Sequence, residues 1–134
     1  MNDVSTNVLD MGLSANRLLG KIKGHVNGPT VVFFAGIHGN ETAGVFAINQ
    51  VLKDLMPENI NGTIYAISGN IKALRQNQRY IDEDLNRIWS KELLEELKLK
   101  EHLNAEESEQ IEIIQILDEI LHAESGPFYF IDFH

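Results

Sequence analysis

The sequence lacks cysteine, and it lacks any apolar stretch of about 18 residues, the length that crosses a bilayer as a helix. Without cysteine there is no disulfide scaffold, no thiolate metal site and no cysteine nucleophile. Without a long apolar stretch there is no candidate for a membrane-spanning helix. Residues Met1–Thr6 also lack the basic and apolar regions of a signal peptide. We therefore expect a cytoplasmic protein that does not enter a membrane.

Basic residues are scarce, with 11 Lys and Arg against 20 Asp and Glu, and the net charge is −9. Residues 91–124 hold 11 acids and 3 lysines, a net charge of −8, so the rest of the chain is nearly neutral. No basic patch is available to neutralise phosphates, which excludes nucleic acid as a partner. We interpret the acidic segment as the solvated face of helices.

The apolar content, 43% of 134 residues, is enough for the core of one domain. Two β-favouring runs, 30–35 and 63–68, are continuously apolar, as in strands that are covered on both faces. Between them, residues 41–55 carry apolar side chains at helical spacing. This strand–helix–strand order predicts an α/β fold with a mostly parallel or mixed central sheet flanked by helices.

Two further strands are expected at the ends of the chain. Residues 17–26 alternate loosely, and Asn27-Gly28 after them predicts a hairpin. Residues 128–133 read as another core-type strand. Because a domain rarely stops at the tip of such a strand, we expect one domain over residues 1–134 that is the N-terminal fragment of a longer protein. The alternative is a small domain whose last strand pairs in a homo-oligomer.

Residues 71–90 are polar and irregular, which predicts loop with short helical turns, and residues 91–103 and 105–123 predict two helices. Asn104 with Glu107 forms a candidate capping box for the second helix. Its expected buried stripe consists of Ile113, Ile116, Leu117, Ile120 and Leu121.

His38 and Glu41 lie just past the first apolar strand, at the expected start of the helix that follows. Positions three apart share one face of a helical turn, so an imidazole nitrogen and a carboxylate oxygen can meet at one point. Gly36 and Gly39 allow the backbone to turn tightly around that point. The pattern alone is weak, because His-x-x-Glu occurs by chance in many proteins.

His134 strengthens this metal hypothesis because it lies at the end of the strand 128–133. If that strand neighbours strand 30–35 in a parallel sheet, the three side chains converge at one rim. Two histidines and one glutamate leave a fourth position open for water, the catalytic arrangement of zinc. Asp132 either orients the His134 imidazole or simply faces solvent.

Three arginines, Arg75, Arg79 and Arg87, lie in the polar segment. Arginine clamps a carboxylate with two hydrogen bonds or stabilises the oxyanion of a tetrahedral intermediate. Composition alone favours plain salt bridges to nearby acids, namely Asp82, Glu83 and Asp84.

Four sequence blocks, in this order, resemble the succinylglutamate desuccinylase/aspartoacylase family of zinc carboxypeptidase-like hydrolases. They are Gly36-x-His38-Gly39-Asn40-Glu41, Gly69-Asn70, Arg79-Tyr80-Ile81-Asp82-x-Asp84-Leu85-Asn86-Arg87 and Asp132-Phe133-His134. The resemblance implies the N-terminal part of that fold and a zinc-dependent amidohydrolase. Its substrate would be a small N-acyl amino acid such as N-succinylglutamate or N-acetylaspartate.

The resemblance also assigns roles. One zinc ion per chain would be held by His38, Glu41 and His134. Arg79 matches the residue that polarises the scissile carbonyl, and Asn86 and Arg87 match the pair that grips the substrate carboxylate. The family's general-base glutamate lies downstream of the third ligand, so we expect this chain alone to be inactive. Two alternatives stay open: a metallocarboxypeptidase on peptides, and a non-catalytic metal-binding or oligomerisation module.

Overall fold

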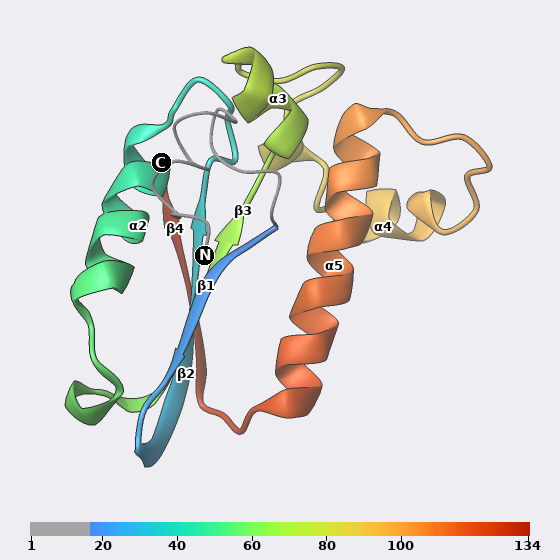
Figure 1. Ribbon diagram of the computed structural model, residues 1–134. Coiled ribbons are helices and arrows are strands. Elements are labelled where there is room, and N and C mark those ends of the chain that lie inside the picture. Colours follow the sequence, from blue (N-terminus) through green and yellow to red (C-terminus); the bar gives the residue numbers. More distant parts are fainter. Residues whose placement is uncertain (1–16) are drawn as a thin grey trace.

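A four-stranded sheet in the order β1-β3-β2-β4 forms the centre of the computed structural model, which describes residues 17–134 (Figure 1). β2 pairs in parallel with β3 and with β4, and β1 pairs antiparallel with β3. The sheet is therefore mixed, as predicted. The strands are β1 Leu18–Lys23, β2 Val26–Ala35, β3 Asn61–Ser68 and β4 Phe128–Phe133.

Helices cover both faces of this sheet, α2 on one face and α5 on the other, while α3 lies beyond its end (Figure 1). The helices are α2 Ala43–Asp54, α3 Ile71–Gln76, α4 Lys91–Leu97 and α5 Ala105–Ala123, with single 3₁₀ turns η1 Pro57–Asn59 and η2 Leu85–Arg87. The strand–helix–strand prediction is confirmed, and so is the short-turn character of residues 71–90. No described helix is long and apolar enough to cross a membrane. The prediction from Met1–Thr6 lies outside the described residues.

The core has two layers because the central strands β2 and β3 are covered on both faces. One layer packs under α2 and contains Ala35, Val45, Ile48, Ala66 and Leu74. The other packs under α5 and contains Val32, Tyr65, Ile67 and Ile120. The two continuous apolar runs in the sequence are thereby explained.

The predicted hairpin at Asn27-Gly28 is wrong. These two residues lie inside β2, and the chain turns before them, between the end of β1 at Lys23 and the start of β2 at Val26. β1 pairs with β3 rather than with β2. Gly28 instead allows β2 and β3 to lie close together, since a Cβ there would lie 2.8 Å from the carbonyl carbon of Asn61.

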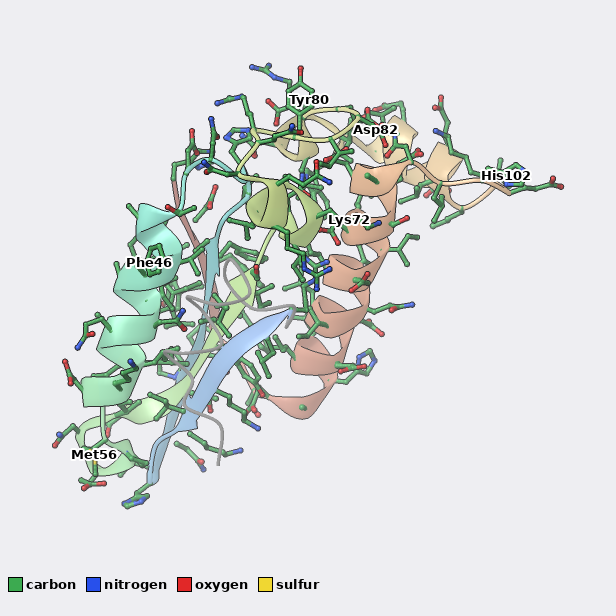
Figure 2. All side chains as sticks on the ribbon, turned by 45° about the horizontal axis from the view of Figure 1, so that its top comes forward. Phe46, Met56, Lys72, Tyr80, Asp82 and His102 are labelled. Carbon is green, nitrogen blue, oxygen red and sulfur yellow. The ribbon has the colours of Figure 1, made fainter. Side chains whose placement is uncertain are left out.

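The predicted helix 91–103 is too long, since α4 ends at Leu97. The apolar side chains beyond it, Leu99 and Leu103, are exposed, so continuing the helix would bury no further surface. His102 consequently lies in the loop between α4 and α5, which projects from the molecule (Figure 2).

Helix α5 has the predicted bounds and the predicted capping box, in which the Asn104 side chain accepts from the Glu107 N–H and the Glu107 side chain accepts from the Asn104 N–H. Ile113 and Ile120 are buried as expected, but Leu121 is 47% exposed. The cap and most of the apolar stripe were therefore readable from local sequence.

The expected solvated acidic face is wrong for the first turns of α5, where the side chains of Glu106, Glu107 and Glu109 are buried. These carboxylates accept hydrogen bonds from backbone N–H groups, Glu109 from Lys72 on α3, Glu106 from Ile81 and Glu107 from the N-cap residue Asn104. A carboxylate can be buried when such donors replace its water.

The last strand is also less buried than predicted. Among residues 17–134, β4 pairs only with β2 and is an edge strand of the sheet. Tyr129, Phe130, Ile131 and Phe133 are all exposed, although their apolar pattern resembles that of a core strand. The pattern correctly predicted the strand but not its position at the edge of the sheet.

Candidate metal centre

The carboxyl ends of β2 and β4 meet at one rim of the sheet, because the two strands are parallel neighbours with Ala35 opposite Phe133. The predicted adjacency of these strands is confirmed. His38 follows β2 and His134 follows β4, and their ring centroids are 5.3 Å apart. One possible ligand atom from each of His38, Glu41 and His134 lies within 4.8 Å of the others.

The loop that carries His38 and Glu41 depends on two glycines. Gly36 has a φ of +76°, a conformation that side-chain-bearing residues rarely adopt. A Cβ on Gly39 would lie 2.1 Å from the carbonyl carbon of Ala73, so only glycine lets the loop pack on α3. The Glu41 N–H donates to the His38 carbonyl oxygen at 3.1 Å. The two residues therefore share a turn before α2, not the first turn of that helix as predicted.

The imidazole of His38 is 3% exposed and lies between two carboxylates. Its Nδ1 is 3.1 Å from Oε2 of Glu41, and its Nε2 is 2.9 Å from Oδ1 of Asp84. With the proton on Nε2, donated to Asp84, Nδ1 keeps a lone pair on the side of Glu41. This carboxylate–imidazole arrangement is the one that orients metal-binding histidines.

Asp84 is ionised in this setting. Burial alone would raise the pKa of its carboxyl group, but the hydrogen bonds from His38 and the Asn86 backbone N–H, with the charge of Arg79, lower that pKa below its ordinary value. Between the two neutral tautomers of His38, a carboxylate at this position favours the one with its proton on Nε2.

His134 is supported in a similar way at the rim of β4. Its Nδ1 lies 2.7 Å from Oδ2 of Asp132, two residues earlier on the same strand. This is the contact that an orienting role for Asp132 requires, and it leaves Nε2 of His134 available as a ligand.

Two of the three predicted arginines, Arg79 and Arg87, lie at Asp84. Arg79 places Nη1 3.5 Å from Oε1 of Glu41 and Nη2 3.7 Å from Oδ2 of Asp84. Arg87 places Nε 3.4 Å from the same Asp84 oxygen and is 80% exposed. The salt-bridge interpretation therefore holds for Asp84, while Asp82 instead accepts from the Ala105 N–H at 2.8 Å.

Two other predicted residues have a looser relation to the centre. Asn86 is exposed, and its backbone N–H donates to Oδ1 of Asp84 at 2.9 Å. Arg75 is exposed on α3. Asp84 was included in a sequence motif, but no role was predicted for it. Its place between Arg79 and Arg87 could have indicated that it pairs with both arginines.

The donor set fits a zinc ion. It offers two imidazole nitrogens and one carboxylate oxygen, and a tetrahedral ion would keep one position for water. Within residues 17–134 it is the only group of three or more His, Cys, Asp or Glu close enough to hold a metal.

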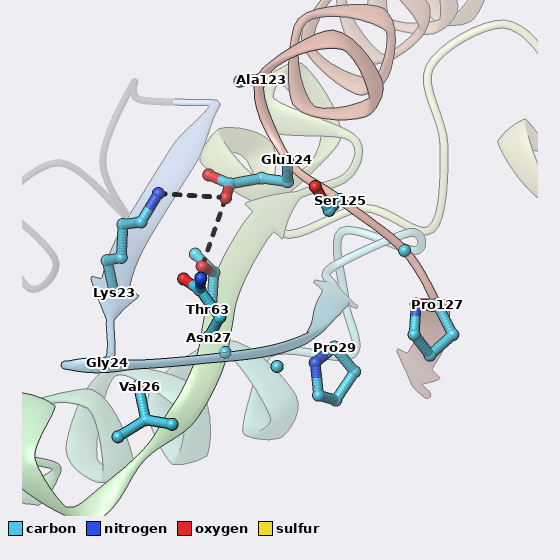
Figure 3. Close-up of a pocket in the computed structure, with 13 residues that line it drawn as sticks. Lys23, Gly24, Val26, Asn27, Pro29, Thr63, Ala123, Glu124, Ser125 and Pro127 are labelled. Carbon is cyan, nitrogen blue, oxygen red and sulfur yellow. Dashed lines mark hydrogen bonds and ion pairs between the residues drawn. The ribbon is translucent and has the colours of Figure 1, made fainter.

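A cavity of about 410 Å³ lies at the opposite end of the sheet (Figure 3). There Glu124 accepts from Lys23 and from Thr63, each at 3.4 Å. These residues lie near the amino ends of the parallel strands, so the cavity is separate from the candidate metal centre.

Comparisons with known proteins agree with the resemblance seen in the sequence. A family model described as the succinylglutamate desuccinylase/aspartoacylase catalytic domain matches residues 27–134. Succinylglutamate desuccinylase of Yersinia enterocolitica is 34% identical over 88 residues, which cover 64% of this chain and 25% of the relative. The enzyme of Serratia proteamaculans is 42% identical over 65 residues, which cover 44% of this chain and 19% of the relative. The chain thus spans a quarter or less of the length of these relatives.

Solved structures share the fold. The succinylglutamate desuccinylase of Chromobacterium violaceum matches with a TM-score of 0.70 at 20% identity, over 98% of this chain and 44% of the other. That of Vibrio cholerae matches with a TM-score of 0.68 at 15% identity, over 96% and 43%. From the fold and the match of the family model, the chain belongs to the succinylglutamate desuccinylase/aspartoacylase family.

Proposed function

We propose that this chain carries the zinc site of an amidohydrolase that removes the acyl group from a small N-acyl amino acid. N-succinylglutamate and N-acetylaspartate are the substrate types. Membership of a family of deacylases supports the reaction class. The observation that carries the proposal is the convergence of His38, Glu41 and His134 at the rim where β2 and β4 end.

In this proposal His38, Glu41 and His134 hold one zinc ion, which would supply a water of lowered pKa and polarise the substrate carbonyl. Asp84 and Asp132 orient the two imidazoles from their far nitrogens. Orientation of this kind fixes the tautomer and raises the basicity of the ligand nitrogen.

Arg79 and the pair Asn86 and Arg87 act on the substrate. Arg79 lies against Glu41, one of the three candidate ligands, so its guanidinium would stabilise negative charge on the carbonyl oxygen of a substrate at this site. Arg87 is farther out and exposed, which suits a residue that meets the free carboxylate of an incoming substrate.

Several finer predictions from the sequence stay predictions. The family resemblance locates the general-base glutamate downstream of His134, so we propose that the 134-residue chain alone does not turn over substrate. Wild-type-like amide hydrolysis by this chain would overturn that proposal. We also keep three further predictions: a cytoplasmic location, a single domain that is a fragment of a longer protein, and a homo-oligomer that forms through the β4 edge. Reading the coding sequence past His134 tests the fragment prediction.

The metal proposal is tested by zinc titration against a chromophoric chelator, comparing the chain with His38→Ala. Zinc affinity is expected to fall by at least about tenfold, because even loss of a residue that only supports a ligand has that cost. His102→Ala is the control, since His102 is exposed in a loop outside the centre. Equal affinities for the chain and His38→Ala would contradict the site.

The substrate proposal is tested on the longer protein that the fragment prediction expects. Amino acid release is measured from a panel of N-acyl amino acids and from peptides with free carboxyl termini. Release from the N-acyl amino acids is expected. Release from peptides alone would favour a carboxypeptidase, and release from neither would favour a non-catalytic module.

A further inference from the structure

Glu106, on the first turn of α5, is a completely buried carboxylate outside the group of candidate metal ligands. Its Oε2 accepts from Nδ2 of Asn70 at 2.7 Å and from the Ile81 N–H at 2.9 Å. Its Oε1 accepts from the N–H groups of Asp82 at 2.8 Å and Glu83 at 3.1 Å. Three consecutive backbone donors and one side-chain donor thus surround a single carboxylate.

The carboxylate is charged despite its burial. Burial alone would raise the pKa of Glu106, but the hydrogen bonds from Asn70 and from the three backbone N–H groups lower it below its ordinary value. The first turn of a helix also favours negative charge. The four contacts are therefore charge-assisted hydrogen bonds, which are stronger than neutral ones.

The three backbone donors belong to the loop that enters the candidate metal centre. Arg79 comes just before them and Asp84 just after them. The carbonyl oxygen of Arg79 accepts from the Gly39 N–H at 3.2 Å, and Asp84 contacts the His38 imidazole. In Figure 2 the labelled Tyr80 and Asp82 lie on this loop, above α3 and beside the start of α5.

We propose that Glu106 is a positioning residue, whose carboxylate holds the loop of residues 79–84 so that Asp84 meets His38 and Arg79 meets Glu41. Without the carboxylate, three adjacent backbone N–H groups lose a buried, charged acceptor, and the loop must move to find water. Any such movement changes the position of Asp84. The consequence for zinc rests on the proposed function, while the anchoring of the loop does not.

Helix α5 offers a matched control one turn later. Glu109 is also a buried glutamate, but it pairs with Arg17 at 2.8 Å and accepts from the Lys72 N–H at 3.0 Å. These contacts join α5 to the segment before β1 and to α3, not to the loop of residues 79–84. Glu106→Gln and Glu109→Gln therefore change the same chemical group on the same helix, and only the first touches the loop.

The first experiment measures zinc affinity and urea unfolding for the wild-type chain and both variants. Glu106→Gln is expected to bind zinc about tenfold more weakly or worse, the effect of losing support for a ligand's partner. Glu109→Gln is expected to keep zinc affinity within about twofold although it also loses stability, since a buried acceptor is changed in both. Equal losses of zinc affinity in the two variants, or none in Glu106→Gln, would overturn the proposal.

The second experiment is amide hydrogen exchange on the metal-free wild-type chain. It tests whether the loop of residues 79–84 is held, even when Glu106→Gln does not fold. The amides of Ile81, Asp82 and Glu83 are expected to exchange at least about 100-fold more slowly than exposed loop amides, because a buried acceptor protects them. Exchange of these three amides at the rate of exposed loops would show that the carboxylate does not hold the loop. A wild-type chain that binds no zinc but protects these amides would contradict the proposed function and leave the anchoring role intact.

Discussion

Asp84 joins more of the candidate centre than any other single side chain described above. One of its oxygens meets the His38 imidazole and the Asn86 N–H, and the other faces both Arg79 and Arg87. One carboxylate thus connects the proposed zinc ligand His38 with the proposed substrate-binding residues Arg79 and Arg87. Asp84 acts on the candidate metal centre through His38, by orienting the imidazole and by its negative charge.

Asp84→Asn tests this connection at the scale of one residue. The amide keeps a similar shape but loses the negative charge that favours the proton on Nε2 of His38, so zinc affinity is expected to fall about 10–100-fold. Affinity is measured by competition with a chelator. Asp118→Asn, on the exposed side of α5, is the control. If both variants bind zinc like the wild-type chain, Asp84 does not support the ligand.

Helix α5 buries apolar side chains along part of its length and charged side chains in its first turns. Its middle turns bury Ile113 beside Leu85 and Ile88, and its last turns bury Ile120 against the sheet, at about 1.5–3 kcal/mol for each buried side chain. Its first turns instead bury carboxylates, including Glu106 against the loop of residues 79–84 and Glu109 against α3. The helix therefore connects the core to the loop of the candidate centre.

Carboxylates around α5 also make the fold sensitive to acid, and Glu124 just after the helix is the clearest case. The hydrogen bond from the Tyr65 hydroxyl at 2.6 Å lowers the pKa of Glu124, against the effect of burial, and Lys23 and Lys21 lower it further. A carboxyl group with a lowered pKa in the folded state stabilises the protein fully above its ordinary value of 4.5. That stabilisation is lost as the pH falls through the lowered pKa.

Glu124→Gln is therefore expected to reduce the dependence of the unfolding free energy on pH below about 4.5. Urea unfolding at a series of pH values from about 3 to about 7, a range that includes the titration of ordinary carboxylates, measures this slope. Glu119→Gln, exposed on the same helix, is the control and is expected to leave the slope unchanged. Parallel pH curves for wild type and Glu124→Gln would contradict the expectation.

At the scale of the whole molecule, the β4 edge exposes several large apolar side chains on one strand. Apolar hollows lie on both faces of this strand, about 350 Å³ beside Trp89 and Phe130 and about 220 Å³ beside Val51 and Phe133. Exposed edge strands with apolar side chains are prone to pair with other chains. We expect the 134-residue chain to associate with itself through this edge.

Ile131→Lys is expected to shift the chain toward the monomer, because a lysine on an edge strand disfavours pairing. Sedimentation velocity or light scattering over a range of concentrations measures the shift. Leu121→Lys adds the same charge at a similarly exposed apolar position on α5, away from the edge, and is expected to leave association unchanged. Association of the wild type that Ile131→Lys does not weaken would exclude β4 as the contact.

Local chemistry alone indicated the strands, the bounds of α5 and its cap, and the glycine turn that presents His38, whereas the motif that ends in Arg87 was identified only through the family resemblance. Apolar periodicity, capping side chains and turn residues act over a few positions, so they can be read directly from the sequence. Only the tertiary structure decided that Asn27-Gly28 lies within a strand, that β4 is an edge, and that Glu106 is buried beneath the loop of residues 79–84. These depend on which distant segments meet: an acidic residue at the start of a helix has the same local sequence whether water or three backbone N–H groups surround its carboxylate.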